Sequence, residues 1–81
     1  MRKLPQRLVN VRVADRGALD GARAVWDAVE RESDGLAGRG RVLIRPSGTE
    51  PLIRVMVEAP EEGECEAVTA RLVETVEREL A

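Results

Sequence analysis

Two short apolar runs that are separated by only seven residues constrain the fold of this chain more than any other feature. Residues 41–44 and 52–57 alternate apolar side chains in the period-2 pattern that is typical of strands. A connection of seven residues is too short for the helical crossover that parallel neighbours need, so the sequence predicts two antiparallel neighbouring strands. The side chains that this pattern places on the buried face are Val42, Ile44, Ile53, Val55 and Val57.

A third strand is predicted over residues 8–13, where Val9, Val11 and Val13 alternate with other residues. Pro5 lies shortly before this run. A proline is tolerated at the beginning of a strand because its missing N–H is not needed there. The run is therefore read as a half-buried strand that begins after Pro5.

The apolar period changes to that of a helix from about Asp20, which is predicted to be the N-cap residue. This helix is expected to end near residues 33–35, where Ser, Asp and Gly gather. Its apolar stripe follows the spacing i, i+3, i+4, i+7 and consists of Ala22, Val25, Trp26 and Val29.

The acidic segment at residues 60–64 begins a second predicted helix, which runs to the terminus. Acidic side chains are favourable there because the N-terminal end of a helix carries a partial positive charge. Cys65 lies in the apolar stripe and is interpreted as a small buried apolar residue. The stripe consists of Cys65, Val68, Leu72, Val73, Val76 and Leu80.

The predicted order β-α-β-β-α describes an α+β fold, and residues 1–81 are expected to form a single domain. Two helices are expected to cover one face of an antiparallel sheet, in two layers. The first strand could lie parallel to the second or be separated from it by the third, and the sequence leaves both arrangements open. An extra strand within residues 1–6 or 46–52 also stays open.

The sheet face opposite the helices is predicted to be mixed in polarity. Its aliphatic residues indicate contact with another surface, and an ordinary solvated face is the alternative. The side chains expected on this face are Leu8, Asn10, Arg12, Leu43, Arg45, Leu52, Arg54, Met56 and Glu58.

Composition excludes several classes of function. Trp26 is the only aromatic residue and the net charge is −2, which argues against stacking on single-stranded nucleic acid and against binding a phosphate backbone. The chain has no histidine and one cysteine, so disulfide frameworks, zinc sites and histidine-based catalysis are excluded within it. No apolar run is long enough to span a membrane, and a cytoplasmic location is expected.

The connection between the two neighbouring strands contains hydrogen-bond donors and a charged side chain that a simple turn does not need. Arg45 offers a fixed fork of donors to phosphate oxygens, and the hydroxyls of Ser47 and Thr49 can donate as well. Gly48 lets backbone N–H groups approach a ligand without a Cβ in the way. These residues indicate a socket for a small anion, most plainly a phosphate. A plain turn with a solvated arginine is the alternative reading.

The strand–loop–strand segment over residues 40–58 resembles the C-terminal domain of the α-D-phosphohexomutases, and residues 4–6 and 9–13 resemble the first strand of the same domain. In that family the last domain carries an Arg-x-Ser-(Gly or Asn)-Thr-Glu-Pro phosphate loop. Pro46 and the strand that follows the loop favour the glucosamine member of the family. The matching loop reads Arg45-Pro46-Ser47-Gly48-Thr49-Glu50-Pro51.

The resemblance implies a TBP-like domain in which this loop grips the phosphate that is not being transferred. Arg45, Ser47, Gly48 and Thr49 would be the phosphate-binding residues. Glu50 would support the loop or a nearby arginine, because a carboxylate beside a phosphate is repelled. The remaining residue with an implied role is Arg54, as a second support or as a peripheral phosphate contact.

The resemblance also implies a four-domain enzyme several times this length. Its phosphoserine, its Mg²⁺ site and its sugar-selecting loop would lie outside these residues, so no catalytic residue and no metal ligand is expected in the chain, and no turnover from the chain alone. The implied reaction interconverts glucosamine 6-phosphate and glucosamine 1-phosphate through a bisphosphate intermediate. The expected partners are the sugar phosphate and the other domains, without nucleic acid or membrane.

Two alternatives stay open. The chain could be the same domain of a phosphoglucomutase or phosphomannomutase, because the loop does not read the sugar. It could instead be a free-standing α+β module that binds an anion or a protein through the mixed sheet face.

Overall fold

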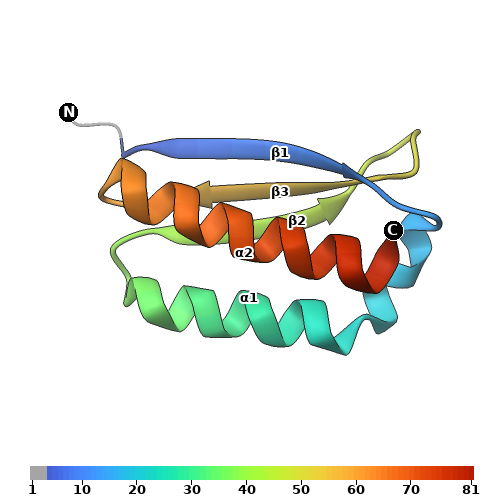
Figure 1. The fold of residues 1–81 in the computed structure, drawn as a ribbon, viewed down its shortest axis with the longest axis horizontal. Helices are drawn as coiled ribbons and strands as arrows, with labels where there is room; N and C mark the ends of the chain where they lie inside the picture. The colour runs from blue at the N-terminus through green and yellow to red at the C-terminus, as the bar shows by residue number, and fades with distance from the viewer. Residues whose placement is uncertain (1–3) are drawn as a thin grey trace.

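Both helices lie on one face of a three-stranded antiparallel sheet in the computed structural model of the chain (Figure 1). The structure describes residues 4–81, apart from the side chain of Arg16. The predicted two-layer α+β fold is therefore confirmed. The elements are β1 (Gln6–Arg12), the 3₁₀ helix η1 (Arg16–Gly21), α1 (Arg23–Leu36), β2 (Arg41–Pro46), β3 (Leu52–Glu58) and α2 (Glu62–Leu80).

The strand order is β1-β3-β2, and β3 is antiparallel to both of its neighbours. This order decides the arrangement that the sequence left open: β1 and β2 run in the same direction but are separated by β3. Pro46 ends β2 and Leu52 begins β3, so residues 46–52 contain no further strand. The other alternative, an extra strand in residues 1–6, lies partly outside the described residues; Gln6 itself begins β1.

The core lies between the sheet and the two helices, and it is aliphatic. Ile53, Val55 and Val57 of the central strand have no exposed surface, which follows from their alternation toward the helices. α2 contacts β1 and β3, whereas α1 contacts β2 and α2. Cys65 is buried, as predicted, and its thiol donates to the Val57 carbonyl at 3.3 Å. From α2 the predicted stripe residues Val68, Leu72, Val76 and Leu80 are buried as well.

The prediction that Asp20 caps the first helix is wrong. Asp20 lies inside η1, and the capping residue of η1 is Asp15, whose carboxylate accepts from the Gly17 amide at 2.9 Å. Leu19 of η1 is buried in the core, so this short helix also contributes apolar area to the packing of the domain. α1 then starts at Arg23 without a side-chain cap.

Trp26 also departs from its predicted place in the buried stripe of α1. Its side chain is 38% exposed, and the indole Nε1 donates to the Leu19 carbonyl at 2.8 Å. The indole needs a partner for its N–H, and η1 supplies one at the edge of the core. Val25, Ala28 and Leu36 are the buried residues of α1.

α1 ends at Leu36, one residue beyond the predicted end, and the chain then turns tightly into β2. Ala37 has a left-handed backbone with φ of 50°, and Gly38 follows with φ of 81°. Gly40 is needed for a different reason: a Cβ built there would overlap the carbonyl oxygen of Glu58. The backbone of β2 can therefore meet the end of β3 only through a glycine.

Candidate functional site

The β2–β3 connection is a compact loop at the end of the sheet where β1 also finishes (Figure 1). The Ser47 amide donates to the Leu52 carbonyl at 2.8 Å, and the Leu52 amide donates to the Glu50 carbonyl at 2.7 Å. The Glu50 amide donates to the Ser47 Oγ at 3.4 Å. A further bond, from the Val13 amide to the Pro51 carbonyl at 2.9 Å, ties the loop to the end of β1.

The two residues at the loop tip present unused backbone donors. Within residues 4–81, the amides of Gly48 and Thr49 donate to no acceptor, and both residues are exposed. Gly48 does not have a positive φ, and a Cβ built on it would meet no atom within 4 Å. The fold therefore does not require glycine at position 48. Close approach of a ligand to the backbone would require it.

Arg45 and Arg54 lie side by side on the sheet face opposite the helices. They are direct cross-strand partners in the β2–β3 register, and both are exposed. With Leu8, Leu43 and Met56 they line a shallow hollow of about 150 Å³. The structure thus brings the predicted phosphate-binding arginine and its predicted support together next to the loop.

The electrostatics of this arginine pair are unfavourable without a ligand. Like charges directly opposite each other destabilise a sheet, and two guanidinium groups about 6 Å apart in water repel by ~0.7 kcal/mol. Neither Arg45 nor Arg54 forms an ion pair with any other described side chain. Arg41, on the same face at the far end of β2, does pair, with Glu58 at 3.5 Å. An anion between Arg45 and Arg54 would turn the repulsion into attraction.

Arg12 lies on the same face, where the alternation of residues 8–13 also predicts it. It is the last residue of β1, its cross-strand partner is Leu52, and its side chain is exposed. It likewise has no ion-pair partner among the described side chains.

The supporting roles predicted for the side chains of Glu50 and Arg54 stay predictions.

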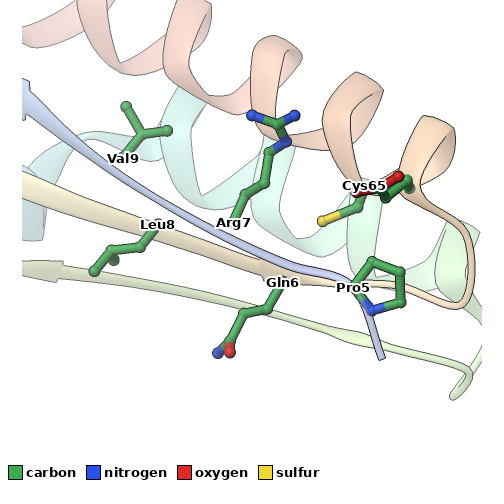
Figure 2. A pocket seen from close by; sticks show the side chains of 7 residues that line it. Pro5, Gln6, Arg7, Leu8, Val9 and Cys65 are labelled. Carbon is green, nitrogen blue, oxygen red and sulfur yellow. The ribbon is translucent and has the colours of Figure 1, made fainter. Parts of the chain in front are cut away.

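A larger hollow, of about 330 Å³, lies at the opposite end of β1, against the beginning of α2. Figure 2 shows Arg7 pointing toward α2, whereas Gln6 and Leu8 point to the other side of the sheet. Arg7 already pairs with Glu66 at 3.5 Å, and the Glu62 side chain also lines the hollow. Since a carboxylate there repels anions, this hollow does not suit a phosphate.

The described part of the chain contains no group of three or more His, Cys, Asp or Glu side chains that could hold a metal ion. Its residues therefore do not fit the Mg²⁺ that the resemblance implies for the whole enzyme. Among the described helices, neither combines the length and the apolar character that crossing a bilayer requires.

Comparisons with known proteins agree on one family. Residues 8–75 match the family model of the phosphoglucomutase/phosphomannomutase C-terminal domain. The phosphoglucosamine mutase of Brevibacillus brevis is 48% identical over 80 residues, which cover 99% of this chain and 18% of that protein. The phosphoglucosamine mutase of Desulforudis audaxviator is 53% identical over 76 residues, which cover 94% of this chain and 17% of that protein.

A solved structure extends the agreement to the fold. Aspergillus fumigatus N-acetylphosphoglucosamine mutase, in complex with GlcNAc-6P and magnesium, superposes with a TM-score of 0.79 at 30% identity, over 96% of this chain and 16% of that one. The chain thus spans less than a fifth of the length of the relatives it matches. Because the family model covers most of its residues, the chain belongs to the family of phosphoglucomutase/phosphomannomutase C-terminal domains.

Proposed function

We propose that this chain is the substrate-phosphate-binding domain of a phosphoglucosamine mutase, which interconverts glucosamine 6-phosphate and glucosamine 1-phosphate. The observation that carries the proposal is that two kinds of hydrogen-bond donor, backbone amides and a guanidinium group, lie at the same end of the sheet without a partner in residues 4–81. The Gly48 and Thr49 amides have no acceptor, and the Arg45 guanidinium has no carboxylate, within the described residues. The similarity to proteins named phosphoglucosamine mutase supports the identity of the substrate.

The loop would hold the phosphate by charge-assisted hydrogen bonds. Arg45 would present two parallel N–H donors to two phosphate oxygens, and the amides of Gly48 and Thr49 would bind the oxygens that face the loop tip. The Ser47 and Thr49 hydroxyls would donate in addition.

Such a site would recognise the phosphate and make no contact with the sugar ring. A mutase that passes through a bisphosphate must hold its substrate in two orientations, with the anchored phosphate on either carbon. A socket that contacts only phosphate oxygens accepts both. The contribution of this domain to the reaction would be positioning, which lowers the barrier by holding the sugar in place while the phosphoryl group moves elsewhere.

The reacting groups would lie in the rest of a four-domain protein. The phosphoserine and the Mg²⁺, which would stabilise charge on the moving phosphoryl group, belong there under this proposal, since no metal-holding group of side chains occurs among the described residues. The chain alone would bind sugar phosphate without turnover. The whole enzyme would work in the cytoplasm, together with its other domains and its sugar phosphate as partners.

A titration tests the proposal. Glucosamine 6-phosphate added to the 81-residue chain should shift the amide NMR signals of residues 47–49 at millimolar concentration, and Arg45→Ala should weaken binding by roughly tenfold or more, because a hydrogen bond to a charged group contributes about 1.5–3 kcal/mol. Arg41→Ala is the matched control, since it removes the same charge from the same strand and face. Equal affinities for the Arg45→Ala and Arg41→Ala variants would contradict the assignment.

The same titration, repeated with other sugar phosphates, tests whether the domain contacts only the phosphate or also the sugar ring. Glucose 6-phosphate and mannose 6-phosphate should bind the isolated chain about as well as glucosamine 6-phosphate, because the loop contacts only the phosphate. A strong preference among the three sugars would show that the domain reads the ring, contrary to the proposal.

A further inference from the structure

Arg12 lies close to the β2–β3 loop, although it belongs to β1, which is not one of the two strands that the loop joins. The next residue, Val13, donates its amide to the Pro51 carbonyl at 2.9 Å, so the end of β1 is bonded directly to the loop. Val11 and Val13 point into the core, and Arg12 between them therefore points to the opposite face. That is the face on which Arg45 and Arg54 lie.

The sheet register places these three arginines within reach of one ligand. Arg45 is directly opposite Arg54, and Arg12 is the diagonal neighbour of Arg54, because the cross-strand partner of Arg12 is Leu52. Diagonal Cβ atoms in an antiparallel pair lie roughly 7–8 Å apart or less, a gap that long side chains cross. Each of the three strands thus contributes one guanidinium to the same end of the face.

The pairing of charges distinguishes this end from the rest of the sheet. Arg7 on β1 pairs with Glu66 at 3.5 Å, and Arg41 on β2 pairs with Glu58 at 3.5 Å. By contrast, Arg12, Arg45 and Arg54 have no carboxylate partner among residues 4–81. The sheet therefore collects its unpaired positive charge where the loop donors are, although the chain as a whole is acidic.

We propose that Arg12 is a third phosphate-binding arginine, which acts with Arg45 and Arg54 on the phosphate held by the loop. This inference rests on the proposed function of the loop. Its physical basis is the gathering of three like charges at one site: neighbouring guanidinium groups repel one another, and a phosphate dianion between them replaces that repulsion with attraction. Arg12 lies outside the sequence motif, since it precedes the loop by more than thirty residues.

The experiment measures inorganic phosphate binding by the 81-residue chain, using the arginine Nε–H and loop amide NMR signals. Arg12→Ala should weaken phosphate binding roughly twofold to fivefold, the range for one exposed charge contact. The Arg12 Nε–H signal of the unsubstituted chain should move with the same half-saturation concentration as that of Arg45. Arg12→Lys should restore part of the affinity, because it keeps the charge and loses the fork.

Two controls remove the same charge elsewhere. Arg7→Ala lies on the same strand but the opposite face, and Arg41→Ala lies on the same face but about 13 Å along β2, beyond the screening length at physiological salt. Both should bind phosphate like the unsubstituted chain. Arg12 is exposed, so its removal should leave the unfolding midpoint unchanged or slightly higher.

The outcomes separate the two proposals. If Arg45→Ala weakens binding while Arg12→Ala matches Arg7→Ala, the loop assignment stands and the role of Arg12 is overturned. If the unsubstituted chain shows no response to phosphate, both proposals are overturned. A static Arg12 Nε–H signal during an otherwise saturating titration would also refute direct contact.

Discussion

Replacing Gly40 with alanine should destabilise the domain without touching the loop. The new Cβ would overlap the Glu58 carbonyl oxygen and lie 3.0 Å from the Ala59 Cα. Both are backbone atoms, so no change of rotamer can relieve the contact. The beginning of β2 would have to move away from the end of β3, at the Arg41–Glu58 pair of the register.

The magnitude follows from three opposing terms. Forcing extra atoms into a packed contact costs about 1–3 kcal/mol, and losing a terminal strand hydrogen bond costs roughly 1 kcal/mol more. Alanine restricts the unfolded chain, which returns about 0.4–1 kcal/mol. The net loss is about 1–3.5 kcal/mol, from a total of roughly 4–12 kcal/mol expected for 81 residues. At ~6 °C per kcal/mol for a domain of this size, the Tm should fall by roughly 6–21 °C.

Urea unfolding followed by far-UV circular dichroism measures this loss, with Gly48→Ala as the control. Gly48 has open space around it and does not have a positive φ, so its substitution should change the free energy of unfolding by less than ~1 kcal/mol, in the stabilising direction. If Gly40→Ala and Gly48→Ala are equally stable with equal m-values, the argument from close backbone approach is wrong.

The remaining predictions concern the loop and the helices. Gly48→Ala, although harmless to stability, should weaken phosphate binding several-fold in the NMR titration, and unchanged affinity would show that no ligand approaches the backbone there. Ala37→Gly should raise the free energy of unfolding by about 0.5–1 kcal/mol, because Ala37 has a φ of 50°; a lower Tm would contradict this. Arg71 donates to both carboxylate oxygens of Glu32 at 2.7 and 2.8 Å, and that bond raises the pKa of Arg71. A double-mutant cycle on Arg71→Ala and Glu32→Ala should still give a coupling of at most ~1 kcal/mol, since Arg71 is largely exposed; a coupling of several kcal/mol would refute that estimate.

The neighbouring strands could be predicted because their pairing is local. Seven residues between residues 44 and 52 permit only an antiparallel hairpin, and the structure has one. The position of β1 could not be predicted in the same way, because a helix separates it from β2 and permits either edge. Only tertiary packing decides that β1 pairs with β3, where Val11 can join Ile53 in the core.

The region around the first helix shows where periodicity fails. Asp20 has the chemistry of a cap, but Asp15 has it too, and the structure places Asp15 at the N-cap of η1 and Asp20 inside that helix. Trp26 falls on the apolar stripe by spacing, yet the hydrogen bond from its indole to Leu19 keeps the ring at the surface. Short-range polar bonds of this kind leave no periodic signal.

In the candidate site as well, residues that are contiguous in sequence could be predicted, whereas a residue brought in by tertiary structure could not. The loop residues from Arg45 to Glu50 are contiguous, so motif and chemistry identify them directly. Arg12 becomes a candidate only when its register opposite Leu52 is known, and that register depends on the strand order. The nearest signal in sequence is the alternation of Arg12 with Val11 and Val13, which predicts that Arg12 lies on the same sheet face as Arg45 and Arg54.

The central place of β3 also bears on how the chain folds. The β2–β3 hairpin closes a short loop and can form within microseconds, whereas β1 must find β3 across about 40 to 50 residues of chain. The entropy of that closure is lost before the pairing stabilises anything, so we expect docking of β1 to follow the assembly of the hairpin with its helices. Until then one edge of β3 stays open to any extended segment, and this order of events would make the N-terminal strand the step at which folding competes with aggregation.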